Sequence, residues 1–379
     1  MKTVKLFDKD SFLSEFEAVV LSSEKSDEFY KIILDKTCFF PEAGGQVSDI
    51  GRLGDGGVFD VQIENDEIVH YCKSGFTAGE KVSGKIDFKR RFSLMQNHSG
   101  EHIVSGIIHK KFGFDNVGFH LNEELVTFDF NGLFSKEQLA EIEYLANKAI
   151  WENRDITAFY PAKEQLKTVN YRSKKEIDGD LRLVKIDGVD ICACCAPHVK
   201  STGQVGLIKF LATEKMRGGT RIYMKCGEYA LKEFVAEHRN AADISNALSV
   251  KKEEIFQGVL SLKEALDKEK QNTALLKKRL ISLLAEQIRE DVRFVEDLSM
   301  PQLQKLCDLL YKKDGKTHTV FSENENGGYS LVISGIPDEV DSIFEKAKKS
   351  LEIKGGGRNG MISCLVTASK EDILKEFSN

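Results

Sequence analysis

A stretch of heptad-spaced apolar residues limits most strongly how this 379-residue chain can fold. From Glu228 to Val292 there is no proline, nothing resembles a strand, and charged residues are dense. The apolar spacing alternates between four and three, as in the seam of a coiled coil. The seam residues are Ile255, Val259, Leu262, Leu266, Leu276, Leu280 and Leu283, interrupted by Glu269 and Thr273. A helix of ~40 residues would span ~60 Å, so we expect it to pair with another helix.

Four parts are expected along the chain, which together predict an α+β protein. Residues 1–88 hold short strand-like runs separated by turn sequences, which indicates a small β-barrel. Residues 89–227 mix helical and strand patterns, and residues 228–292 form the coiled-coil helices. Residues 293–379 alternate helix and strand and are long enough for a small α/β domain.

Composition restricts the class of protein. Hydrophobic residues make up 41% and charged residues 30% of the chain, which is ordinary for a soluble globular protein and excludes a largely disordered one. No apolar run reaches the ~20 residues of a membrane span, and the start turns polar before a secretory core could form, so we expect no membrane association and a cytoplasmic location. A net charge of -6 excludes a strongly basic nucleic-acid clamp but allows a local basic patch.

Two helix boundaries can be predicted from local signals. Apolar residues at helical spacing begin near Lys89, and Gly113 is a plausible end of that helix. Ser135 and Gln138 form a capping box at the start of a second helix.

The first of these helices carries His98 and His102. Residues four apart lie on one face of a helix, so both imidazoles can reach a single metal ion. No glutamate occupies position 99, and the HExxH motif of metalloproteases is therefore excluded.

A second pair of possible ligands follows much later in the chain. Cys194 and His198 form a CxxxH motif, and Pro197 favours a turn that directs both side chains the same way. Together with His98 and His102 they make a plausible N₃S set for Zn²⁺. Cys192 and Cys195 are a competing CxxC pair, for which a redox or zinc-knuckle role stays open.

Four separate motifs give the chain a family resemblance. They are PEAGGQVSDIG at 41–51, NHSGEH at 97–102, VTFDF at 126–130 and CCAPHV at 194–199. In this order they resemble the editing domain of alanyl-tRNA synthetase, and most closely the free-standing alanyl-tRNA editing proteins of the AlaX family. The tail, with GGGRNG at 355–360, more weakly resembles the C-terminal DHHA1 domain. The chain has CCAPH where the synthetase usually has CGGTH.

The resemblance implies a zinc-dependent, ATP-independent hydrolase that removes a wrong amino acid from tRNA(Ala), chiefly serine and secondly glycine. It implies that His98, His102, Cys194 and His198 hold Zn²⁺ and take part in catalysis. The implied substrate-binding residues are Thr37, Gly44, Gly45, Gln46, Asn116 and His120. Zinc could activate water or only position the substrate, and both alternatives stay open.

Two further expectations concern partners. The seam predicts a homodimer through the C-terminal region, because a monomer would leave it partly exposed. The alternative function is a zinc-containing tRNA-binding or oligomerisation protein without catalytic activity, although a structural zinc needs no glycine-rich loop.

Overall fold

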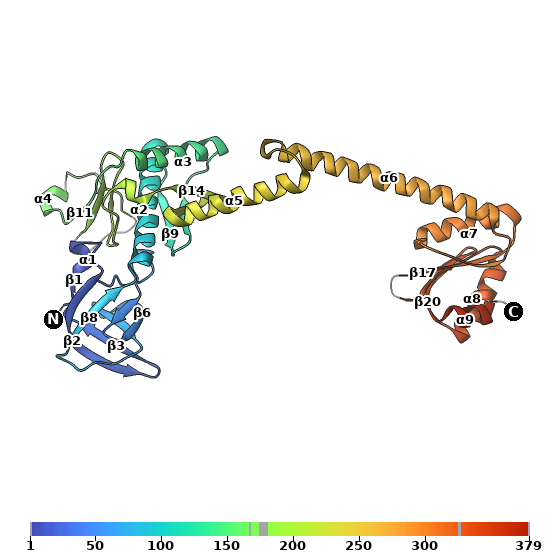
Figure 1. Ribbon diagram of the computed structural model, residues 1–379, viewed down its shortest axis with the longest axis horizontal. Helices are drawn as coiled ribbons and strands as arrows, with labels where there is room; N and C mark the ends of the chain where they lie inside the picture. The colour runs from blue at the N-terminus through green and yellow to red at the C-terminus, as the bar shows by residue number, and fades with distance from the viewer. Residues whose placement is uncertain (1, 167, 174–180, 325–326, 378–379) are drawn as a thin grey trace. The chain divides into compact units, whose positions relative to one another are not determined.

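The computed structural model describes residues 2–166, 168–173, 181–324 and 327–377. The protein mixes helices and sheets, which confirms the predicted α+β class. It divides into two compact units, Met1–Ala242 and Asp243–Asn379 (Figure 1). The four-part division inferred from the sequence stays a prediction. Among the described residues, no helix is long and apolar enough to cross a bilayer.

The first unit begins with six strands that close into a barrel, in the order β2-β3-β7-β6-β5-β8. Their bounds are β2 (Glu15–Ser26), β3 (Phe29–Leu34), β5 (Gly51–Leu53), β6 (Gly56–Glu64), β7 (Glu67–Cys72) and β8 (Lys81–Ile86). Alternate residues point inward, as along β8, where Val82 and Ile86 are buried and their neighbours are exposed. The short parallel pair β1 (Val4–Lys5) and β4 (Lys36–Thr37) and helix α1 (Leu6–Lys9) accompany the barrel.

Helix α2 (Phe88–Phe112) follows the barrel directly and is buried over most of its length. The Asp87 side chain caps its first turn by accepting a hydrogen bond from the Arg90 amide. Gly113 ends it in the left-handed conformation, with φ 70°, as the sequence predicts. The predicted capping box of Ser135 and Gln138 is confirmed at the start of α3 (Lys136–Trp151).

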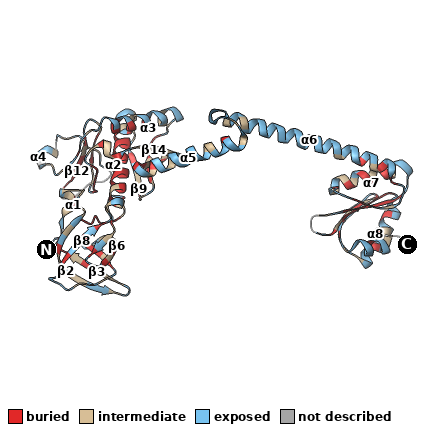
Figure 2. Cartoon of the chain, in the orientation of Figure 1, coloured by how far each residue is buried: buried red, intermediate tan, exposed pale blue. Residues whose placement is uncertain are grey.

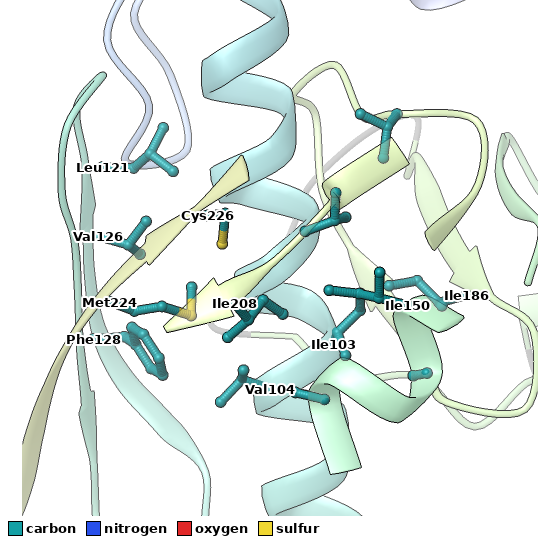
Figure 3. Close-up of a cluster of buried hydrophobic side chains, with 14 of the residues drawn as sticks. Ile103, Val104, Leu121, Val126, Phe128, Ile150, Ile186, Ile208, Met224 and Cys226 are labelled. Atoms are coloured by element: carbon teal, nitrogen blue, oxygen red, sulfur yellow. The ribbon is translucent and has the colours of Figure 1, made fainter. Parts of the chain in front are cut away.

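Two sheets and α3 surround α2. One sheet has the order β14-β15-β10-β9 and the other β11-β12-β13. Their bounds are β9 (Asn116–Leu121), β10 (Val126–Phe130), β11 (Ile156–Phe159), β12 (Leu183–Ile186), β13 (Asp190–Ala193), β14 (Ile208–Met216) and β15 (Gly219–Cys226), with the short helix α4 (Lys163–Leu166) after β11. Figure 3 shows residues of both sheets and of α3 packed against Ile103 and Val104 of α2. A hydrophobic core separate from that of the barrel therefore forms around the helix that carries the two predicted histidine ligands.

The second unit contains a five-stranded sheet in the order β16-β17-β18-β20-β19. The strands are β16 (Val292–Val295), β17 (His318–Glu323), β18 (Tyr329–Ser334), β19 (Glu352–Arg358) and β20 (Met361–Thr367). Val320 and Val332 pack with α7 (Met300–Asp314), while Phe321 and Leu331 pack with α8 (Pro337–Ser350) and α9 (Lys370–Phe377). Helices therefore cover both faces of this sheet.

The long helical segment differs from the single helix of ~40 residues inferred from the sequence. Helix α5 (Gly227–Leu248) ends before Ser249, which has a positive φ of 54° that a continuous α-helix does not allow. Helix α6 (Ile255–Gln287) then carries the whole predicted seam. Figure 2 shows α6 exposed over most of its length.

The first part of the glycine-rich run at 355–360 lies within a strand. Gly355, Gly356 and Gly357 belong to β19, which pairs with β20. A Cβ atom at Gly357 would stand 2.0 Å from the Met361 carbonyl oxygen, so this close strand pairing requires glycine.

Candidate metal centre

Helix α2 brings His98 and His102 together inside the first unit. Their ring centroids are 5.3 Å apart, and both residues are almost completely buried. Because α2 is central to the core, neither imidazole can move far without disturbing the packing around it.

A turn after β13 supplies the other two candidate ligands. The Arg182 guanidinium donates hydrogen bonds to the backbone oxygens of Cys194 and Ala196, each at 2.9 Å. This holds the turn so that the Cys194 Sγ lies 3.5 Å from His98 Nε2 and 3.3 Å from His198 Nε2.

The four side chains lie close enough together to share one ion. Each offers a ligand atom, and these atoms lie within 4.8 Å of one another. A tetrahedral zinc site with Zn–S of ~2.3 Å and Zn–N of ~2.0 Å separates sulfur from nitrogen by ~3.5 Å. The two Sγ–Nε2 distances agree with this value, so Cys194, His98 and His198 fit Zn²⁺ in both chemistry and spacing. His102 adds a further nitrogen donor within 4.8 Å of the other three.

Other polar groups lie near Nδ1 of the imidazoles, on the side of each ring away from Nε2. Gln46 Oε1 lies 2.8 Å from His98 Nδ1, and Ser99 Oγ lies 3.0 Å from His198 Nδ1. Asp190 Oδ2 is 3.6 Å from His102 Nδ1. With Nδ1 occupied in this way, Nε2 of His98 and of His198 faces the thiol, the arrangement by which proteins position metal-binding histidines.

Burial changes the pKa values of the Cys194 thiol and the His198 imidazole. It raises the pKa of the Cys194 thiol well above its usual value. Burial, and then the nearby His102, His98 and Arg182, lower the pKa of His198. The metal-free centre therefore holds a thiol and a neutral imidazole, and zinc binding would release the thiol proton.

A cavity of about 670 Å³ opens beside this cluster. Its wall includes Gly44 and Gly45, whose φ values are +60° and +83°. A Cβ at Gly45 would stand 2.6 Å from the Phe119 ring, so only glycine allows this loop to approach β9 so closely.

The predicted substrate-binding residues fall into two groups. Gly44 and Gly45 line the cavity, and Gln46 contacts His98 directly. The other three, Thr37, Asn116 and His120, are not among the lining residues.

The positions of these three residues differ from those expected. The Thr37 hydroxyl is buried in the barrel, 2.8 Å from His70 Nε2, and it accepts a hydrogen bond from the Phe39 amide. The Asn116 amide donates to Glu101, and His120 is exposed on β9. The reason is strand geometry: alternate side chains of a strand point to opposite faces, and packing decides which face meets the cavity.

The competing cysteine pair does not form a bond. All eight cysteines lie among the described residues and are free. Both residues line the cavity, but Cys195 is exposed whereas Cys192 is buried on β13. Cys192 forms a second possible metal group with His102 and Asp190.

Sequence reasoning missed several residues of this site. Ser99 and Glu101 stood within the HxxxH motif, and a polar residue beside a predicted ligand was the available signal. Asp190 and Arg182 had no such signal, because they reach the cluster only through the folding of β12 and β13.

Two family models of known proteins match parts of this chain. Residues 181–223 match the family model described as the threonyl and alanyl tRNA synthetase second additional domain. Residues 2–90 match that of class II (A) tRNA synthetases.

Three relatives illustrate the extent of the similarity. The chain is 26% identical to the alanyl-tRNA editing protein AlaX-L of Pyrococcus horikoshii, over 98% of this chain and 96% of the relative. It is 27% identical to the alanyl-tRNA editing protein Aarsd1-A of Xenopus laevis, over 87% and 83%. It is 30% identical to alanine–tRNA ligase of Ignicoccus hospitalis, over 99% of this chain but only 42% of the ligase. The chain thus spans about two fifths of the ligases it matches, and its resemblance to the alanyl-tRNA editing proteins is confirmed over nearly its whole length.

Proposed function

We propose that this chain is a trans-editing hydrolase that cleaves the ester between a wrong amino acid and the 3′ end of tRNA(Ala). Serine is the chief error and glycine the second. The observation that supports this best is the N₃S cluster beside a glycine-walled cavity. It occurs in a chain similar from end to end to an alanyl-tRNA editing protein.

In this proposal His98, His102, Cys194 and His198 hold Zn²⁺. When bound, the ion would supply Lewis-acid chemistry, either by polarising the ester or by making a water more acidic. Gln46 and Ser99 keep two of the imidazoles oriented. Gly44 and Gly45 leave room for the acceptor end to reach the cluster.

A hydrolytic site is needed in addition to the amino-acid pocket of the synthetase. A synthetase pocket built for a methyl group discriminates against slightly larger or smaller side chains by only ~1–3 kcal/mol. A separate hydrolytic site can instead test for a serine hydroxyl, which alanine and glycine both lack, so glycyl-tRNA is expected to be the slower of the two substrates. Correctly charged alanyl-tRNA should therefore escape cleavage.

The direct test is deacylation of tRNA(Ala) charged with serine, glycine or alanine. We expect seryl-tRNA to be cleaved fastest and alanyl-tRNA to persist. His102→Ala should abolish cleavage, and Glu137→Gln on the exposed surface of α3 should not. A zinc-loaded protein that cleaves none of the three would favour the alternative, a tRNA-binding or oligomerisation protein.

We further propose the organisation of the chain. Residues 1–88 form a barrel domain with the glycine loop, and residues 89–227 form the zinc-binding editing domain. Residues 228–292 form coiled-coil helices, and residues 293–379 form a DHHA1-like domain. The exposed seam of α6 supports a homodimer through this C-terminal region, since Leu262, Leu276 and Leu283 are each more than half exposed.

A further inference from the structure

Lys5 is an exposed cation of β1 in the wall of the cavity beside the metal cluster. Within the part of the chain that the structure describes, it makes no ion pair. The other lysine or arginine among the described lining residues, Arg182, is already engaged. Its Nε lies 3.5 Å from Asp8 Oδ1, and its Nη1 donates to two backbone oxygens. Lys5 is therefore the side chain of this wall whose permanent positive charge can meet an incoming anion.

The backbone on either side of Lys5 is fixed to the barrel. Before it, Thr3 Oγ1 donates a hydrogen bond to the Leu34 carbonyl oxygen at 2.8 Å. After it, the buried Phe7 ring packs edge-on against Phe40, with the ring centroids 5.4 Å apart. Phe40 lies shortly before the glycine loop in the chain. The segment that carries Lys5 therefore has a fixed place beside the start of that loop.

The glycine loop adds backbone donors to the same wall. Ala43 and Gln46 close a two-residue turn, because the amide of each donates to the carbonyl oxygen of the other, at 3.2 and 3.1 Å. Gly44 and Gly45 between them both have positive φ, as a type I′ turn requires. Both glycines are exposed, and their amides donate to no other group among the described residues. Successive backbone amides in a turn form a concavity that binds anions.

We infer that Lys5, together with the amides of Gly44 and Gly45, binds the phosphate that joins the last two nucleotides of the tRNA; this inference rests on the proposed function. The terminal ribose carries both this phosphate and the aminoacyl ester. An ester whose carbonyl lies at the metal cluster therefore brings the phosphate to the wall of the same cavity. Because the protein has a net charge of -6, a local cation is needed to attract the phosphate. The contact positions the acceptor end and does not distinguish one amino acid from another.

The test compares seryl-tRNA(Ala) with the same substrate carrying an uncharged methylphosphonate between its last two nucleotides. The wild-type protein should cleave the natural substrate with a kcat/KM ~10-fold higher, the effect of one charge-assisted hydrogen bond. Lys5→Gln should lose this factor on the natural substrate, cleave the methylphosphonate as the wild type does, and keep its zinc. The loss should appear in KM rather than in kcat, because the phosphate takes no part in the reaction and is bound equally before and in the transition state. Lys81→Gln, at the exposed start of β8, should leave both rates unchanged.

Each other outcome has a defined meaning. An equal loss on both substrates would show that Lys5 acts on something other than this charge and would overturn the inference. A Lys5→Gln protein that cleaves the natural substrate as well as the wild type does would overturn it too. A wild-type protein that cleaves the two substrates equally would also overturn it while leaving the editing activity intact. A zinc-loaded wild-type protein that cleaves neither would instead refute the proposed function.

Discussion

Cys194 differs from the three histidines of the cluster because it must lose a proton before it can bind a metal. We expect Cys194→Ala to lose most of its zinc, since it removes the sulfur that lies within 3.5 Å of two imidazole nitrogens. Its neighbour Cys195 is exposed, so Cys195→Ala is a matched control that should retain the metal. Metal analysis of both purified proteins checks this, and full occupancy in Cys194→Ala would contradict the assignment.

Thr37 offers a second test at a single residue. Its hydroxyl bonds to His70 inside the barrel, so Thr37→Val leaves a buried nitrogen without a partner and should cost about 1–3 kcal/mol of stability. We therefore expect cleavage of seryl- and glycyl-tRNA to fall by the same factor, measured side by side. A loss confined to seryl-tRNA would show that this hydroxyl reaches the substrate after all.

His70 should make the stability of the protein depend on pH. Burial lowers its pKa to about 4, although a hydrogen bond to the Ile32 carbonyl opposes the shift. The unfolded chain, with a pKa of ~6.5, binds the proton more readily, so stability is complete above that pH and is lost as the pH falls towards 4. Between pH 7 and 5 the loss should be about 2 kcal/mol.

Urea unfolding at the two pH values measures this difference. His70→Gln cannot titrate, so its stability should change less over the same interval. An unchanged pH dependence in the variant would assign the effect to other groups.

At the scale of elements, one face of α6 is buried and the other is exposed. Ile281 and Ala285 pack into the core with α7, whereas Leu276 and Leu280 stay exposed on the seam. We expect Leu276→Asp and Leu280→Asp to abolish the proposed dimer with little effect on the fold, because neither side chain is buried in the monomer.

Leu275 provides the control for this prediction. It is 48% exposed and adjoins the seam without belonging to it, so Leu275→Asp should leave the dimer intact. Light scattering of the three variants measures whether each is a dimer or a monomer. A dimer that survives both seam substitutions would place the contact elsewhere.

At the scale of the whole molecule, the metal centre and the seam lie in different units. All four candidate ligands belong to Met1–Ala242, and α6 belongs to Asp243–Asn379. A chain shortened to end at Ala242 should therefore be monomeric and still bind one zinc ion. A shortened chain that remains a dimer would refute association through the C-terminal region.

The sequence alone determined those features that depend on neighbours within a turn or two. The end of α2 at Gly113 and the capping box of Ser135 follow from backbone conformation and local hydrogen bonds. The four candidate ligands could be named because HxxxH and CxxxH spacings each present two donors on one side of a short segment. The seam of α6 could be predicted because its apolar residues recur every three or four positions and so lie on one face of a helix.

Only the tertiary structure decided where side chains far apart in sequence meet. Thr37 turned into the barrel towards His70, and Asn116 turned towards Glu101, because packing and strand pairing select one face of each strand. The contact of Asp190 with His102 spans 88 residues of chain and leaves no local signal. Periodicity and capping are short-range effects, whereas the partners of a buried polar group depend on the whole fold, since each buried charge or donor must be satisfied wherever the chain brings a partner.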